Sequence, residues 1–378
     1  MRITLSDMGH AQELLPLTYT RPIAAFRVGI TTIAEKYTGR GHEVGYQTQD
    51  YLQAKFPGLD NSEVVVYGGV CPTDEFLEAV TGLAAGEGLT VDDKLVAYKG
   101  EAGQQTPYNG ELNVIWRAWD VFSYNAAELE ADFTRITAGR TSAPIHESNT
   151  LIGDRVFLEE GAEVYGCTLN SLDGPVYVGK NALIMEGSVV RNGLAMCAHS
   201  VVKMGAKIYG ATTLGPYCKV GGELNNAVLF AYSNKGHEGF LGNAVLGEWC
   251  NIGADTNNSN LKNNYDQVRS WTYDTGRFTP TGLQFCGLIM GDHSKTGINT
   301  MLNTGTVVGV SANIYGAGFP RNFIASFTWG GAQGIKEYRL NAAFDTAERM
   351  MARRGIPLDE VERKILEEVY SRSAEYRR

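Results

Sequence analysis

Aliphatic residues recur at an interval close to six from about residue 151 onward. The stretches "LIGDRVFLEEGAEVYG", "VYVGKNALIMEGSVV" and "FLGNAVLGEWCNIGA" keep this spacing, and glycine or another small residue often follows the aliphatic one. An amphipathic helix repeats at about 3.6 residues and a half-buried strand at two. An interval of six instead predicts a solenoid in which each hexapeptide forms one short strand and one tight corner.

The same repeat predicts what fills the solenoid. The aliphatic residue of each hexapeptide points inward and stacks on its equivalent in the next coil, about 4.8 Å away. Glycine, of which the chain has 45, suits corners that need a positive φ or a close backbone approach. The alternative is a β-sandwich with glycine-rich loops, which the persistence of the interval disfavours.

Residues 1–140 show a different pattern. The stretches "EVVVYGGV" and "KLVAYKG" are typical of buried strands, and "TDEFLEAVTGLAAG" is typical of a helix with an acidic first turn and a glycine stop. Alternating strands and helices predict an α/β domain here. We expect the solenoid to follow over residues 145–330.

Residues 331–378 return to helical spacing. The stretches "KEYRLNAAFDTAERMMARRG" and "PLDEVERKILEEVYSRSAEYRR" carry apolar residues three and four apart, and Gly355 and Pro357 mark a break between them. We expect a C-terminal helical cap that seals the open end of the solenoid. A helix pair that binds a partner is the alternative.

Composition excludes several classes of protein. The net charge of −9 and the lack of a long basic run argue against nucleic-acid binding. No apolar run reaches the roughly 18–20 residues that span a bilayer, and the N-terminus does not resemble a secretion signal. The six cysteines form no CxxC pair, so we expect reduced thiols in a cytoplasmic protein with no membrane contact.

The stretch Gly236-His237-"EGFLGNAVLGEWCNIGADTNNSN" carries a specific resemblance. It is similar to the pattern "GH", then "GDxxIGxxxNIGAGT", then an asparagine-rich loop, in the acetyltransferase half of the bifunctional N-acetylglucosamine-1-phosphate uridyltransferase and glucosamine-1-phosphate N-acetyltransferase family. The resemblance covers roughly residues 145–320. It implies a left-handed parallel β-helix of hexapeptide repeats, a homotrimer, and transfer of an acetyl group from acetyl-CoA to an amino-sugar phosphate or nucleotide sugar in cell-envelope biosynthesis.

The resemblance also implies roles for individual residues. His237 corresponds to the general base, and imidazole is the natural base near neutral pH. The implied substrate-binding residues are Lys203, Glu223, Asn226, Phe240, Asn251 and Asn260. A family lysine is replaced by Asn225 or Asn226, and a family tyrosine by Phe240, so the acceptor sugar stays open.

Acetyl-CoA is expected along the outside of the solenoid, with Lys295 and Arg321 binding its phosphates. His199 and His293 occupy ordinary corner positions, which predicts structural roles. A polar and aromatic stretch over residues 257–285 interrupts the repeat and predicts a lid or a subunit contact. Its cations Lys262, Arg269 and Arg277 would then reach phosphates; the alternative is a solvated loop.

A second resemblance lies at the N-terminus. "PLTYTRP", from Pro16 to Pro22, is similar to the "PLTxxxPK" that follows the "GGxGTR" phosphate loop of sugar-phosphate nucleotidyltransferases. The loop here reads "DMGHAQE", and Gly68-Gly69 stands where the family has a metal-binding "GD". The implied nucleotide-binding residues are Gly9, Arg21 and Arg27, with Mg²⁺ required only if the domain is catalytic.

Three functions follow from these features. The first is an N-acyltransferase for an amino-sugar phosphate. The second is a bifunctional enzyme that also forms UDP- or dTDP-sugars. Because the loop lacks glycines that would offer backbone N–H groups to phosphates, the third is a non-catalytic scaffold that binds sugar nucleotides.

Overall fold

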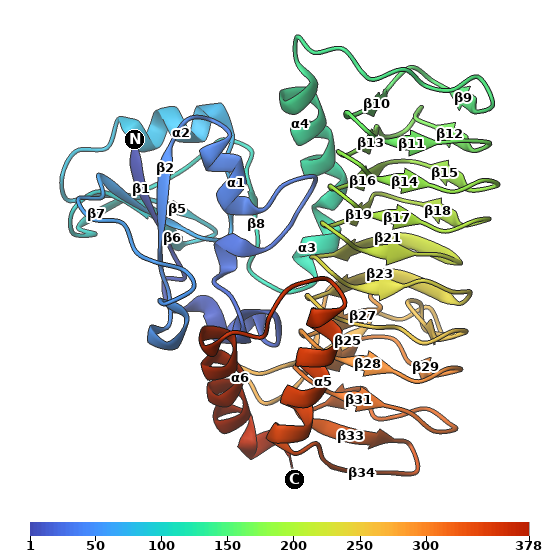
Figure 1. Ribbon diagram of the computed structural model, residues 1–378. Helices are drawn as coiled ribbons and strands as arrows, with labels where there is room; N and C mark the ends of the chain where they lie inside the picture. Colours follow the sequence, from blue (N-terminus) through green and yellow to red (C-terminus); the bar gives the residue numbers. More distant parts are fainter. Residues whose placement is uncertain (378) are drawn as a thin grey trace.

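A computed structural model describes residues 1–377 of the chain. In Figure 1 an N-terminal α/β region lies beside a tall stack of short strands, and two C-terminal helices lie between them. No helix within residues 1–377 has the length and apolar character needed to cross a bilayer.

The N-terminal region is built on a six-stranded sheet in the order β2-β1-β3-β6-β5-β7. Its strands are β1 (Arg2–Ser6), β2 (Glu43–Gln47), β3 (Val64–Tyr67), β5 (Glu87–Val91), β6 (Lys94–Tyr98) and β7 (Gln104–Pro107). The strand β1 pairs in parallel with both β2 and β3. The short strands β4 (Val70–Cys71) and β8 (Asn113–Val114) pair separately. The predicted strands and the α/β class of this region are therefore present.

Side-chain caps fix where the main helices of this region begin. The helix α1 (Ile33–Thr38) begins with a capping box in which Thr32 and Glu35 each accept a backbone N–H of the other. The helix α2 (Asp74–Thr81) begins at the cap Thr73 and ends at Gly82, as its sequence pattern predicts. The remaining helical segments are η1 (His10–Leu14), η2 (Leu17–Tyr19), η3 (Ile23–Ala25), η4 (Asp50–Leu52), α3 (Asp120–Ser123) and α4 (Asn125–Thr137).

The solenoid has three faces, each a ladder of short parallel strands, except that the last strand of the third face pairs antiparallel with its neighbour. The first face holds β9 (Thr150–Ile152), β12 (Thr168–Asn170), β15 (Val189–Arg191), β18 (Lys207–Tyr209), the first halves of β21 (Glu223–Leu229) and β23 (Phe240–Leu246), β24 (Asn257–Asn258) and β29 (Met301–Leu302). The second face holds β10 (Val156–Leu158), β13 (Val176–Val178), β16 (Leu194–Met196), β19 (Thr212–Leu214), the second halves of β21 and β23, β27 (Leu288–Met290), β30 (Thr306–Val308) and β32 (Phe323–Ile324).

The third face completes each coil. It holds β11 (Glu163–Val164), β14 (Leu183–Ile184), β17 (Val201–Val202), β20 (Lys219–Val220), β22 (Asn234–Lys235), β28 (Lys295–Thr296), β31 (Asn313–Ile314), β33 (Thr328–Gly331) and β34 (Gly334–Glu337). Aliphatic side chains from the three faces form the continuous internal column that the repeat predicts. The fold is therefore an α/β region, a left-handed β-helix and C-terminal helices. All six cysteines are free and buried.

Polar contacts tie the N-terminal region to the second face. The fully buried Asn125, at the start of α4, accepts hydrogen bonds from the Gly29 backbone N–H (2.8 Å) and the Thr213 hydroxyl (3.1 Å). Its amide donates to the Ala211 carbonyl oxygen at 2.8 Å. A buried amide is stable only when its polar atoms are paired, so Asn125 fixes the position of this region on the solenoid.

The C-terminal helices do not seal the end of the solenoid, which corrects the sequence-based expectation. The helices α5 (Leu340–Ala352) and α6 (Glu360–Arg372) run along its side (Figure 1). Past α5, Arg354 donates to the Tyr217 carbonyl, and on α6 Glu362 pairs with Lys55 of the N-terminal region. The apolar face of α5, including Ala343, Phe344, Ala347 and Met351, packs into the core shared by all three parts, where its apolar side chains are removed from water.

The stretch that interrupts the repeat is a packed hairpin and not a free lid. Its strands β25 (Arg269–Thr272) and β26 (Arg277–Pro280) pair antiparallel. Trp271 stacks on Phe323 with ring centroids 4.2 Å apart, and Asp274 forms an ion pair with Arg117 at 3.0 Å. These contacts fix the hairpin to both the solenoid and the N-terminal region. Lys262 is paired locally with Asp266 at 3.8 Å.

Candidate functional site

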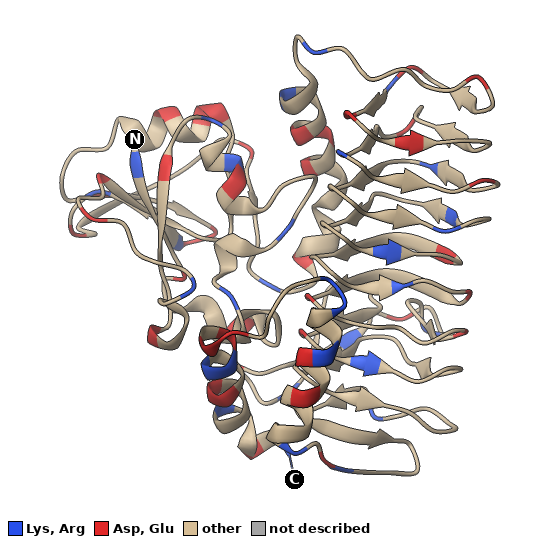
Figure 2. Cartoon of the chain, viewed as in Figure 1, with Lys and Arg blue, Asp and Glu red and all other residues tan. Residues whose placement is uncertain are grey.

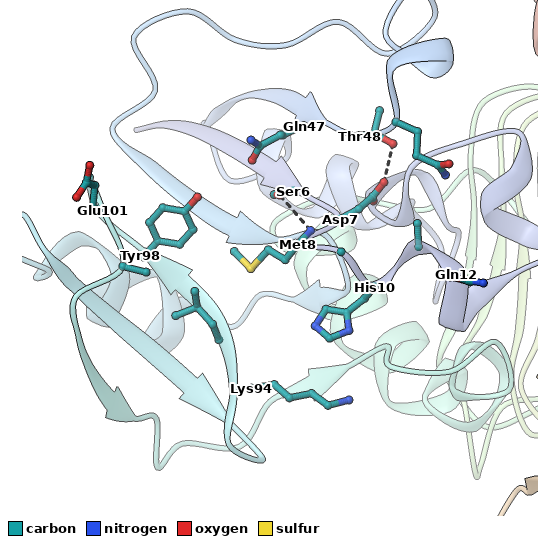
Figure 3. Close-up of a pocket in the computed structure, with 16 residues that line it drawn as sticks. Ser6, Asp7, Met8, His10, Gln12, Gln47, Thr48, Lys94, Tyr98 and Glu101 are labelled. Atoms are coloured by element: carbon teal, nitrogen blue, oxygen red, sulfur yellow. Dashed lines mark hydrogen bonds between the residues drawn. The ribbon is translucent and has the colours of Figure 1, made fainter. Parts of the chain in front are cut away.

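A cleft of about 960 Å³ opens at the carboxyl ends of β1 and β2. Its walls are residues 6–12, residues 47–49 and part of β6 with the turn that follows. In Figure 3, Met8 and His10 face the opening from the loop after β1, and Tyr98 faces it from β6. The carboxyl ends of parallel strands are the usual place for ligands in α/β folds, so this cleft is a candidate binding site.

Asp7 gives the cleft its shape. Its carboxylate accepts hydrogen bonds from the Ile23 backbone N–H at 2.9 Å and from the Thr48 hydroxyl at 2.5 Å. Burial raises the pKa of Asp7, although these hydrogen bonds oppose the shift. Each carboxylate oxygen therefore already has a partner, and Asp7 joins the loop to the end of β2. Gly9 lines the cleft with φ = +83°, and its predicted contact with a nucleotide stays a prediction.

The cleft contains one lysine and one histidine, neither of which sequence reasoning identified. The His10 ring nitrogen lies 2.9 Å from Glu13, and the Lys94 ammonium lies 4.3 Å from the centre of the Trp116 ring. Trp116 in turn stacks on Tyr67 at 4.5 Å. A single ammonium beside aromatic rings suits a sugar or nucleoside with few phosphates better than a triphosphate, which needs more neutralising charge.

The predicted nucleotide-binding arginines do not line this cleft. Arg21 is buried and forms ion pairs with Glu248, at 3.0 Å, and with Asp292 of the solenoid. Arg27 is also buried, donating to the Ile30 carbonyl and lying 3.6 Å from Glu35. Because a buried guanidinium needs paired acceptors, both arginines serve the fold, and their assignment to nucleotide binding is corrected.

His237 lies on the corner that leads from the third face to the first, and its side chain is exposed. The preceding inward position of the column, where other coils place valine or isoleucine, is Lys235. Lys235 is 1% exposed, and its ammonium donates to the carbonyl oxygens of Gly221 (3.0 Å) and His237 (2.7 Å). Burial lowers the pKa of Lys235 to about 8. A buried lysine thus fixes the backbone that presents the imidazole.

The glycine after this corner is also required by geometry. Gly239 has φ = +112°, and a Cβ there would lie 2.2 Å from the Thr256 carbonyl oxygen. Glu238 on the same corner pairs with Lys207 at 3.3 Å. Glu223 and Phe240 are register partners in adjacent coils on the neighbouring first face. The structure therefore brings these two predicted residues together, on the face that His237 precedes.

Two other predicted residues are used by the fold. Asn260 donates to the Asn243 side-chain oxygen at 2.8 Å. Asn226 lies at a corner with φ = +49°, where its amide bonds to the carbonyls of Phe122 (3.0 Å) and Ala211 (3.3 Å). These bonds lie at the edge of the first face opposite His237, and they use the amide nitrogens of both side chains. Contact of Asn226 and Asn260 with substrate stays a prediction.

The remaining predicted residues fall in separate places. Lys203 lies on the third face two coils before His237, which corresponds to about 10 Å along the stack. Asn251 and Lys295 are direct bridge partners on the same face and line a groove beside α5. Arg321 lines a different cavity, of about 240 Å³, near the last coils. Lys295 and Arg321 therefore line two separate cavities, and the binding of acetyl-CoA phosphates by either residue stays a prediction.

His199 and His293 belong to a column of stacked rings. Successive ring centroids along His199, Tyr217, Tyr232, Trp249 and His293 lie 4.7, 5.2, 4.1 and 6.4 Å apart. All five residues have φ between +53° and +60°, at equivalent corners of successive coils. Burial lowers the pKa of His293 to about 3, so this imidazole is neutral. The predicted structural role of both histidines agrees with this arrangement.

Comparison with known proteins matches one part of the chain to a family. Residues 3–141 match the family described as sugar nucleotidyl transferase. No curated protein sequence matches the chain. Among solved structures, an Arabidopsis UDP-N-acetylglucosamine acyltransferase overlaps 61% of this chain and 79% of its own, at 11% identity and a TM-score of 0.28. The N-terminal region is thus similar to sugar nucleotidyl transferases, which supports a transferase related to sugar nucleotides.

Proposed function

We propose that the protein is a transferase that holds a sugar phosphate or nucleotide sugar in its N-terminal cleft. One observation carries the proposal: the cleft is formed by the loop after β1, within the segment that is similar to sugar nucleotidyl transferases. We expect the Lys94 ammonium, which lines the cleft 3.9 Å from the Glu13 carboxylate, to bind a phosphate oxygen. Tyr98, which lines the cleft, offers apolar ring surface to a sugar or base, and Trp116 supports the Lys94 ammonium from behind.

Calorimetric titration of the full chain tests this binding. UDP-N-acetylglucosamine and glucosamine 1-phosphate are the probes, and Lys94→Met should weaken binding by about tenfold, since loss of a charged hydrogen bond costs about 1.5–3 kcal/mol. The matched control is Lys99→Met, which removes a lysine just beyond β6 that does not line the cleft. Equal affinity for the wild type and Lys94→Met would refute the assignment.

We further propose acyl transfer at the His237 corner. The amine of an amino-sugar phosphate would attack the carbonyl carbon of acetyl-CoA, forming a C–N bond as the C–S bond breaks. The His237 imidazole would accept the amine proton and return it to the departing thiolate of coenzyme A. The corner supports this proposal, because the Lys235 ammonium fixes the His237 backbone through its carbonyl oxygen while the imidazole stays accessible. A second copy of the chain beside the exposed corner, as in a homotrimer, would enclose the reactants.

A thiol-release assay with acetyl-CoA and a panel of amino-sugar phosphates tests the reaction. His237→Ala should lower the rate by about 10²–10⁴-fold. The control His146→Ala removes another exposed imidazole, at the start of the solenoid. A wild-type rate in His237→Ala would exclude the proposed base. No turnover with any acceptor, together with tight binding in the cleft, would instead favour a sugar-nucleotide sensor.

Nucleotidyl transfer in the cleft is the second candidate, favoured by the family similarity. The residues present do not fit its Mg²⁺ requirement, because Gly69 stands where the resembled family has a metal-binding aspartate. Within residues 1–377, no group of three or more Asp, Glu, His or Cys side chains is arranged to hold a metal ion. Release of pyrophosphate from UTP or dTTP with sugar 1-phosphates and Mg²⁺ would establish this activity despite the missing ligands.

A further inference from the structure

A groove of about 560 Å³ runs between α5 and the third face of the solenoid. Five cations line it: Lys219 and Lys295 from the solenoid, and Arg349, Arg353 and Arg354 from the end of α5 and the turn that follows. No aspartate or glutamate lines the groove within the described chain. In a protein with a net charge of −9, this concentration of positive charge is unusual and points to an anionic ligand.

Within residues 1–377, Arg349 forms an ion pair with Asp345 at 3.8 Å, and the other hydrogen-bond partners of the groove's cations are neutral oxygens. The Lys295 ammonium donates to the His293 carbonyl at 2.7 Å, and the Arg354 guanidinium lies 3.4 Å from the Asn234 side-chain oxygen. Burial lowers the pKa of Lys295 to about 8, and burial with neighbouring Arg354, Lys203 and Arg353 lowers that of Lys219. Burial is the larger cause at both lysines, and the neighbouring cations add to it at Lys219 alone. A bound anion would favour the charged form of both ammonium groups.

The solenoid strands beneath α5 carry an unusual ladder of outward side chains. Along the third face, the outward register position is Glu163, Leu183 and then Val201 in the earlier coils. In the next five coils it is Lys219, Asn234, Asn251, Lys295 and Asn313, and Trp329 follows. A face that a helix simply covers would keep apolar residues there. The change to lysine and asparagine provides N–H donors instead, which suit phosphate oxygens.

One wall of the groove is rigid. Tyr232 and Trp249, both in the column of stacked rings, lie 4.1 Å apart with 5° between their planes, so they present their edges to the groove. The opposite wall carries the arginines at the end of α5, and Figure 2 shows basic residues on that helix and on the solenoid. The arginines thus face the solenoid's lysines across the groove. This arrangement can hold two phosphates at once.

We propose that this groove binds a small molecule carrying two or more phosphate groups. Neither His237 nor any residue of the N-terminal cleft lines it, so the inference goes beyond the function proposed above. Five cations exceed what a single phosphate would neutralise, and the volume admits a ligand of nucleotide size. A nucleoside diphosphate and coenzyme A share this chemistry. Both contain adjacent phosphates.

Calorimetry on the full chain tests the site with pyrophosphate, UDP, coenzyme A and orthophosphate. Pyrophosphate should bind at least tenfold more tightly than orthophosphate, and added salt should weaken it. The double variant Arg349→Gln, Arg353→Gln should lower that affinity at least tenfold. Both side chains are exposed, so the variant is expected to fold. The matched control is Lys336→Gln, Arg339→Gln, at exposed positions before α5 that do not line the groove.

The titrations also separate the two ligand sources. Tighter binding of UDP than of pyrophosphate, lost in the double variant, would identify a nucleoside diphosphate as the ligand. Tighter binding of coenzyme A would identify that cofactor instead. Unchanged affinities in the double variant, or equal binding of orthophosphate and pyrophosphate, would overturn the proposal. Because binding and not turnover is measured, a failed acyl-transfer assay leaves this test intact.

Discussion

The burial of Lys235 inside the solenoid predicts how the free energy of unfolding changes with pH. The substitution Lys235→Met keeps most of the methylene chain that packs inside the column, where the register partner in the preceding coil is Val220. It removes the ammonium and its hydrogen bonds to the Gly221 and His237 carbonyls. Lys235 is 1% exposed and almost fully shielded from solvent, so keeping it charged lowers the free energy of unfolding.

The size and sign of that cost follow from the pKa of Lys235. Burial lowers it from 10.5 to about 8, and each unit corresponds to about 1.36 kcal/mol, giving about 3 kcal/mol. Below pH 8 both folded and unfolded states carry the proton and the full penalty applies. Between about pH 8 and 10.5 the unfolded state binds more protons than the folded state. The contribution of Lys235 to the free energy of unfolding therefore rises with pH across that window.

Urea unfolding of the wild type and Lys235→Met, from pH 7 to 10.5, measures this contribution. The unfolding free energy of the wild type minus that of the variant should increase by about 3 kcal/mol across the window. Taking this difference removes the contributions of the buried tyrosines and cysteines, because these groups titrate in both proteins. Lys180→Met, at an exposed position, corrects for the loss of one charge. A difference that stays constant with pH would refute the account of a buried, hydrogen-bonded ammonium.

Three further substitutions test the contacts that hold the parts together. Arg21→Met should lower the unfolding free energy by about 3–5 kcal/mol in urea titrations, because Asp292 stays buried without its partner; a loss below 1 kcal/mol would contradict this. Trp249→Ala removes a ring from the stacked column and should lower the unfolding free energy in urea titrations by about 3–5 kcal/mol. An unfolding free energy close to that of the wild type would show that the stack contributes little. Lys36→Met should lower the unfolding free energy by a similar amount at pH 7, because Asp132 loses an ammonium 2.7 Å away. This loss should shrink as the pH falls and the carboxylates protonate. A loss that does not change with pH would contradict the role of the ion pair.

The repeat was readable from the sequence because its period comes from short-range geometry. An inward aliphatic residue and a small corner residue recur in each coil, and the packed column contains them as expected. The same reasoning could have found Lys235, which takes the inward position beside Val220 in the coil register. It was missed because the coil that ends at His237 is shorter than its predecessors, so a strict count of six loses the register there.

Contacts between residues far apart in the chain could not be predicted from the sequence. The arginine in "TYTRP" is 271 residues from the aspartate that binds it, and no local pattern distinguishes such an ion pair from a phosphate site. Apolar positions of α5 such as Phe344 and Met351 predict that one face of the helix is buried. They do not say what covers that face. The expected cap at the end of the solenoid failed for this reason.

The groove beside α5 shows how such a long-range contact creates a candidate site. Lys219 and Arg354 are far apart in the sequence, and neither belongs to a motif. Docking of α5 on the shared core brings them to the same groove, without a carboxylate among its lining residues within 1–377. The Coulomb repulsion of these cations acts against the docked position of the helix, so a phosphate ligand that binds there must also stabilise α5 on the solenoid. Helix docking and ligand binding are therefore thermodynamically coupled, and the free groove should be the less stable state.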